Sequence, residues 1–92
     1  MSAEKIFSDA NAFRTELRRL GITKVVFAYV KERRVEQTSD EKIEVLPYIR
    51  LEVIAYMDAV IYKYVAKDID LEAMHAVFSE DFEVKKVNRN IT

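Results

Sequence analysis

The sequence predicts an α+β fold of two layers, in which helices cover one face of an antiparallel sheet. Apolar residues near the N-terminus recur every three or four positions, which is typical of an amphipathic helix. The longest apolar run, Tyr48 to Ala66, instead alternates with a period of two and is rich in Ile, Val and Tyr. A second helix is predicted after Asp70. The expected order is α-β-β-β-α-β in a single domain over 1–92.

The first predicted element is a helix that begins at Ser2 or at Ser8, since Ser is a favoured N-cap residue. Gly21 follows the last apolar residue of this segment and is a good helix stop. One stripe of the helix is apolar and is expected to pack on the sheet: Ile6, Ala10, Phe13, Leu17 and Leu20.

The first predicted strand runs from Ile22 to Gln37. Its first half is apolar on both faces, which indicates a central place in the sheet. Its second half, Lys31 to Gln37, is strongly charged and is expected to extend beyond the core. The polar segment Thr38 to Lys42 is predicted to be a turn.

A second strand is predicted from Ile43 to Met57, with Pro47 at an edge position or a bulge because proline cannot donate to a strand ladder. A hairpin bend follows, and a third strand covers Ala59 to Ala66. The alternative is one long helix over 47–67 in a mainly α fold, because several apolar residues of this run also follow helical spacing. Two strands are the preferred interpretation, since the polar residues would scatter around such a helix.

The second helix is predicted over Leu71 to Ser79, with Asp70 as its N-cap. Ile69 precedes the cap and is placed to pack against Met74. A short last strand is expected around Phe82, Val84 and Val87, and it completes the sheet.

The composition excludes several classes of site. The 92 residues include no Cys and a single Gly, so neither a disulfide, a thiolate metal site nor a glycine-rich phosphate loop is possible. No segment has the length and apolarity of a membrane span, and the N-terminus lacks the apolar core of a leader peptide. We expect a cytoplasmic protein without membrane contact.

The net charge of −1 is unevenly distributed along the chain. Residues 1–34 hold eight basic and four acidic residues (8 − 4 = +4), and residues 35–84 hold four basic and twelve acidic ones (4 − 12 = −8). Residues 85–92 add three basic residues and no acidic one (+3), and the sum is −1. This layout predicts either a bipolar surface that steers partners or an ordinary mixed surface.

The predicted order resembles that of two nucleic-acid-handling families. Double-stranded RNA-binding domains place a basic cluster at the start of their second helix, whereas this helix opens with Asp68, Asp70 and Glu72. The core of restriction-endonuclease-like nucleases implies an acid on the second or third strand, which Asp58 matches, followed by Asp or Glu with Lys two positions later. The third strand lacks that pair. Asp40 to Lys42 does have the Asp-x-Lys spacing, but it precedes Asp58 and lies in the predicted turn.

The remaining chemistry-bearing residues do not form a recognisable site. Asp68, Asp70 and Glu72 alternate as in a calcium loop, but the glycine that such a loop needs is replaced by Ala73. His75 is the single histidine and is predicted to face solvent, with no nucleophile motif to accompany it. We expect no metal, no cofactor and no catalytic residue, and therefore not an enzyme.

The tyrosines suggest an association surface instead. All five fall on predicted strands, and some are expected on a sheet face that the helices leave open. Tyrosine is enriched at binding hot spots. The partner-binding candidates are Tyr48, Tyr56, Tyr62 and Tyr64.

Three basic groups support an alternative, an RNA- or DNA-binding module, provided that they converge on one surface. They lie on the first helix, on the charged second half of the first strand and in the C-terminal tail: Arg14, Arg18, Arg19, Lys31, Arg33, Arg34, Lys85, Lys86 and Arg89. Because the sequence pI is acidic, near 5.8, nucleic acid is the second choice.

The preferred function is a small non-enzymatic interaction protein: a regulator, an inhibitor or an oligomeric subunit. It is expected to bind a protein partner, or itself as a homodimer, through a sheet edge or a Tyr-bearing sheet face. By analogy of fold alone, a phage-type inhibitor of a nucleic-acid-handling complex is one such role, in which the acidic middle of the chain mimics nucleic acid.

Overall fold

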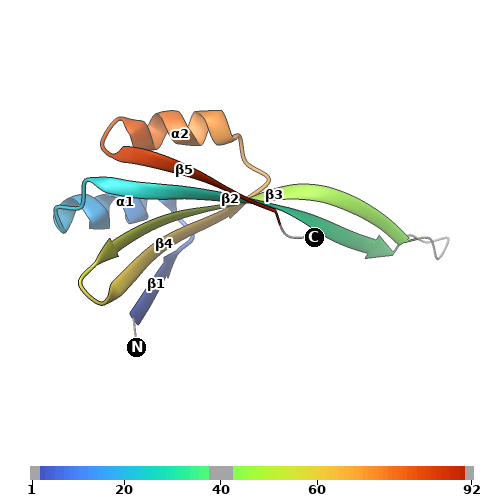
Figure 1. Cartoon of the computed structure of the whole chain (residues 1–92), viewed down its shortest axis with the longest axis horizontal. Coiled ribbons are helices and arrows are strands. Elements are labelled where there is room, and N and C mark those ends of the chain that lie inside the picture. Colours follow the sequence, from blue (N-terminus) through green and yellow to red (C-terminus); the bar gives the residue numbers. More distant parts are fainter. Residues whose placement is uncertain (1–2, 38–42, 91–92) are drawn as a thin grey trace.

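The computed structural model describes residues 3–37 and 43–90, and the side chains of 3–30 and 48–87. Two helices pack on one five-stranded sheet, so the α+β prediction is confirmed (Figure 1). The elements are β1 (Ala3–Phe7), α1 (Ala10–Arg19), β2 (Lys24–Gln37), β3 (Ile43–Met57), β4 (Val60–Lys67), α2 (Leu71–Ser79) and β5 (Glu83–Asn90). The long-helix alternative over 47–67 is wrong, since β3 and β4 occupy that segment.

The sheet has the strand order β1-β4-β3-β2-β5 and is mixed, which corrects the antiparallel sheet of the prediction. Its three central strands form the expected antiparallel meander. Both edges are parallel, because β1 pairs with β4 and β5 pairs with β2. The reason is the connectivity: α1 joins β1 to β2 and α2 joins β4 to β5, and a helical crossover returns the chain to the end of the sheet from which it came.

Strand β1 replaces the predicted first turns of the helix. Helix α1 begins at Ala10, with Asp9 as N-cap, and the Asp9 carboxylate accepts hydrogen bonds from the N–H groups of Asn11 and Ala12. Ser8 is not the cap, Ser2 is outside the described residues, and Ile6 lies in β1 and not on the helical stripe. The other end is as predicted, because Gly21 follows the helix with a φ of 76°.

The core lies between the two helices and one face of the sheet. Phe13 and Leu17 of α1 and Phe78 of α2 are all completely buried there. The Phe78 ring lies 6.0 Å from that of Phe13 and 5.4 Å from that of Phe27, at steep interplanar angles. These edge-to-face contacts fix both helices on the same side of the sheet.

One Asp residue lies just before β4 and another just before α2. Asp58 opens the turn between β3 and β4 with a φ of 55°, a conformation that Asp tolerates better than most residues other than glycine. Asp70 caps α2 through hydrogen bonds to the N–H groups of Glu72 and Ala73. The predicted bounds of α2 are confirmed without change.

Strands β2 and β3 extend past the rest of the sheet as a two-stranded arm (Figure 1). Strand β4 reaches only as far as Arg50, and β5 reaches only as far as Lys31. Within the described residues, the pairs from Glu32–Tyr48 to Gln37–Ile43 therefore have no third strand beside them. This confirms the expected extension of the charged half of β2. Pro47 lies in the arm and has the predicted edge position, and the predicted turn over Thr38–Lys42 is outside the described residues.

Candidate functional site

The two faces of the sheet have different surroundings. Both helices pack on one of them, and we call the other the uncovered face. Because residues that pair across strands share a face, the register assigns its members: Glu4, Ile6, Lys24, Val26, Ala28, Val30, Arg50, Glu52, Ile54, Tyr56, Ile61, Lys63, Val65, Lys67, Glu83, Lys85 and Val87. Apolar and charged residues alternate over this surface, unlike the apolar face under the helices.

Two large apolar side chains are strongly exposed on the uncovered face. Ile6 of β1 is 67% exposed and Tyr56 of β3 is 64% exposed. In the described part of the chain, no other large hydrophobic residue is strongly exposed. Ile54, two residues before Tyr56 on the same face of β3, is 6% exposed, although no helix covers it. Long charged side chains of neighbouring strands shield such positions by lying across them. The face therefore presents an apolar centre with two projecting residues.

Most charges on the uncovered face are paired with each other. The Lys63 ammonium lies 3.0 Å from the Glu4 carboxylate and 3.6 Å from that of Glu52, and the hydrogen bond to Glu4 raises the pKa of Lys63. Lys24 and Glu83 form a looser pair at 3.9 Å, with both side chains largely exposed. Lys85 is exposed and has no ion-pair partner among the described residues.

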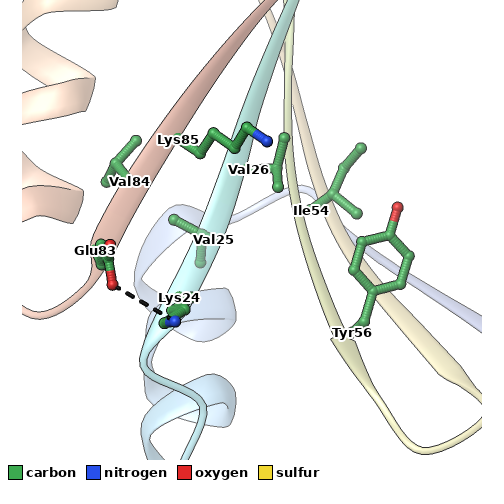
Figure 2. Close-up of a pocket in the computed structure, with 8 residues that line it drawn as sticks. All are labelled: Lys24, Val25, Val26, Ile54, Tyr56, Glu83, Val84 and Lys85. Atoms are coloured by element: carbon green, nitrogen blue, oxygen red, sulfur yellow. Dashed lines mark ion pairs between the residues drawn. The ribbon is translucent and has the colours of Figure 1, made fainter.

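A shallow groove crosses the uncovered face where β2 and β3 separate (Figure 2). Their pairing ends at Val26 and Ile54, and beyond this pair the strands diverge. The groove has a volume of about 380 Å³ and is lined by Lys24, Val25, Val26, Ile54, Tyr56, Glu83, Val84 and Lys85. In Figure 2 the Tyr56 ring and Ile54 lie on one bank, opposite the Lys24–Glu83 pair. An aromatic bank and a charged bank suit a protein side chain better than a phosphate.

The predicted tyrosine surface needs correction. Tyr62 and Tyr64 are each only 6% exposed, because their positions in β4 point toward the helices. The Tyr64 ring lies 6.0 Å from that of Phe13, and burial, together with the nearby Asp9 carboxylate, raises the pKa of Tyr64. Tyr48 is half-buried near the base of the arm, with the Lys67 ammonium 5.9 Å from the centre of its ring. Of the four candidates, Tyr56 alone is exposed on the uncovered face.

The basic candidates whose side chains are described do not gather on one surface. Arg14 is held by Asp81 at 2.7 Å and Glu80 at 3.9 Å, and it ties α1 to the end of α2. Arg18 and Arg19 are exposed on α1, where Arg19 pairs with Glu16. Lys85 and Lys86 are neighbours in β5 and therefore project to opposite faces.

Four further basic candidates belong to the strands, but their side chains are outside the described residues. Lys31, Arg33 and Arg34 lie in β2, where the register pairs them with Ile49, Pro47 and Leu46 of β3. Arg89 lies in β5 opposite Val30. Their backbone positions place Arg33 and Arg34 along the arm, and Lys31 and Arg89 at the end of the sheet nearest to it.

His75 is half-buried, in contrast to the solvent-facing position predicted for it. Its ring is nearly perpendicular to that of Phe27, with 5.8 Å between the ring centroids, and its Nδ1 lies 3.3 Å from the Ser79 hydroxyl. Among the described residues, no three His, Cys, Asp or Glu side chains are grouped as metal ligands. Asp58, the matched acid of the nuclease pattern, lies in an exposed turn.

Comparison with protein-family models, with curated proteins and with solved structures finds no match to this chain. Within the described ranges, no helix combines the length and the apolarity needed to cross a membrane. The function is therefore inferred from the geometry of the uncovered face.

Proposed function

We propose that this chain is a small non-enzymatic interaction protein that binds a protein, either a partner or a second copy of itself, through the uncovered face of its sheet. The observation that carries the proposal is the exposure of Ile6 and Tyr56 on that one face. Burying a large apolar side chain contributes about 1.5–3 kcal/mol, so the two residues offer a substantial driving force for association. Regulator, inhibitor and oligomeric subunit are roles that such a surface fits.

The charges of the face support a protein partner over a nucleic acid. Affinity for a phosphate backbone comes from cations that neutralise phosphates, and it needs several of them on one surface. Here Lys63 and Lys24 already face carboxylates of the same surface. Three of the four arginines with described side chains lie on α1, and the fourth, Arg50, lies in β3. A mixed apolar and charge-paired surface is what protein interfaces have in common.

Site-specific photo-crosslinking in the cells that make this protein tests the proposal. A benzophenone amino acid replaces Tyr56 in one variant and Thr15, an exposed residue of α1, in the control. We expect irradiation to attach a protein at position 56, and to attach little at position 15. The mass of the product shows whether the captured chain is a second copy or another protein.

An absence of any protein product at position 56, or equal yields at the two positions, would overturn the proposal. Treatment of the extract with nuclease before analysis removes products held together by RNA or DNA. A position-56 product that disappears on this treatment would favour the nucleic-acid alternative instead.

A further inference from the structure

The uncovered face has a charge pattern that complements itself. Two rows of residues cross the strands next to the groove. The register pairs every step of these rows except the one from Tyr56 to Lys24, where β2 and β3 separate. The outer row contains Glu4, Ile61, Tyr56, Lys24 and Glu83. The inner row, one step nearer the arm, contains Ile6, Lys63, Ile54, Val26 and Lys85. On β5, the acid of the outer row is thus followed by the unpaired base of the inner row.

From this arrangement we propose that the occupant of the uncovered face is a second copy of the same chain, stacked face to face about a two-fold axis that runs across the strands between the two rows. The proposal deepens the function proposed above and rests on it. Such an axis lays the outer row of each copy on the inner row of the other. It places Tyr56 against Ile54 of the second copy, and Glu83 against Lys85 of the second copy.

Charge selects this axis over its main competitor. A two-fold axis along β3 would instead bring Glu4 against Glu83 of the second copy, and Glu52 against its own counterpart. Like charges across an interface are strongly unfavourable. The axis across the strands avoids both pairs, and it gives Lys85 the carboxylate that it lacks among the described residues of its own chain. Because the contact occurs twice in a two-fold dimer, two such ion pairs form.

The dimensions of the face agree with a dimer contact. Five strands spaced about 4.8 Å apart give a width of about 24 Å, and six or seven residues at about 3.3 Å give a length of about 20 Å. Its projected area is roughly 500 Å², to which protruding side chains add, and a standard interface buries about 800 Å² per partner. The chain exposes 6526 Å², whereas a monomer of its 10.8 kDa mass ordinarily exposes about 5,500 Å². An open sheet face and a projecting arm both add to this surface.

A pair of charge-reversed variants tests the arrangement. The dimer has two Glu83–Lys85 contacts. With Lys85→Glu, these contacts hold four acids, and with Glu83→Lys they hold four bases. We expect each variant alone to dissociate at least tenfold more readily than the wild-type protein in sedimentation equilibrium. A mixture of the two variants re-forms both ion pairs in a mixed dimer, which we expect to associate within about threefold of the wild type. These factors follow from the cost of facing like charges.

Lys86→Glu is the matched control, since it makes the same change at the next residue of β5 on the opposite face. It should leave the dimer unchanged. Circular dichroism of each variant verifies its fold, and Tyr56→Ser provides an uncharged change that should also dissociate the dimer.

Two results would overturn this inference. One is a wild-type chain that remains monomeric up to about 100 µM, far above the Kd of a specific dimer. The other is a mixture of charge-reversed variants that associates no better than either alone. If position 56 is nevertheless crosslinked to a different protein in cells, the proposed function stands and only the second-copy occupant is refuted.

Discussion

The two faces of this sheet belong to the same five strands but have different surroundings. Within β4, Tyr62 and Tyr64 are buried among the rings of the helix layer, while Lys63 between them faces outward to Glu4 and Glu52. The covered face owes its apolar character to the helices that pack on it. The uncovered face has the alternating apolar and charged residues of a surface that remains folded in water and still has apolar area to bury.

The comparison between the tyrosines shows that their position in the register decides their role. Tyr56 and Tyr62 belong to the same hairpin, yet one is 64% exposed and the other is 6% exposed. A residue one position further along a strand moves to the other face.

Replacing Phe78 with Ala should cause the greatest loss of stability. Its ring is fully buried between α1, α2 and β2, and truncation leaves a cavity that these elements cannot close. We expect the free energy of unfolding to fall by about 3–5 kcal/mol in urea titration. Ile6→Ala on the uncovered face is the comparison and should change it by less than about 0.5 kcal/mol in dilute protein. Equal losses at the two positions would mean that the faces do not differ as described.

Replacing a tyrosine of the covered face should likewise cost more stability than replacing one of the uncovered face. Tyr62→Ser removes a ring from the core, and we expect a loss of about 2–4 kcal/mol in the free energy of unfolding. Tyr56→Ser should cost less than about 0.5 kcal/mol when dilution keeps the chain monomeric. The same urea titration, performed on both variants, measures the difference. A large loss for Tyr56→Ser would show that its ring serves the fold and not association.

Gly21→Ala should have an intermediate effect through the end of α1. Open space surrounds the position of the added Cβ, so the cost comes from the backbone, whose φ of 76° suits few residues with a side chain. We expect a loss of about 1 kcal/mol in the free energy of thermal unfolding. Thr23→Ala, exposed two residues later, is a control without that backbone demand. No difference between the two variants would contradict the described helix end.

Alkaline pH should lower the free energy of unfolding by a small amount through one titrating group on each face. The pKa of Lys63 is raised by its hydrogen bond to Glu4, and that of Tyr64 by burial. A raised pKa in the folded state contributes stability at neutral pH that is lost as pH rises past the unfolded value, here about 10 for both groups. Stability should therefore decline from about pH 9.5 upward.

Two variants show how much of this loss of stability comes from the group on each face. Tyr64→Phe should remove the part due to the covered face, and Lys63→Met the part due to the uncovered face. Each variant should lose stability less steeply than the wild-type protein in urea titrations between about pH 9 and pH 11. Identical slopes for all three proteins would exclude both groups as the cause.

Much of the fold follows from local patterns in the sequence. Asp70 followed by Leu71 and Glu72 specifies α2, since the cap and the apolar spacing lie within one short segment. The hairpin of β3 and β4 is likewise predicted from its alternation. Strand β1 is not, because five residues are too few to show a period. It forms by pairing with β4, as in the bond from the Ala3 N–H to the Ala59 carbonyl.

The candidate site is only partly predictable for a related reason. Alternation indicates that Tyr56 and Tyr62 lie on strands, but it does not say which face the helices cover. That depends on the two crossovers, which α1 and α2 make on the same side of the sheet. Ile6 was not predicted as a site residue because it continued the helical stripe of α1. Its only sequence signal is the strand propensity of Ile-Phe beside charged neighbours.

Hydroxyl-radical footprinting of the tyrosines tests the difference between the faces most directly, because one experiment reports on both. It compares the dilute purified chain with the same chain in intact cells. We predict that Tyr56 is oxidised readily in dilute protein and is protected in cells, whereas Tyr62 and Tyr64 stay unreactive in both. If Tyr56 reacts equally in the two settings, its face is not occupied. If Tyr62 reacts as fast as Tyr56 in dilute protein, the two faces do not differ in the way that the structure describes.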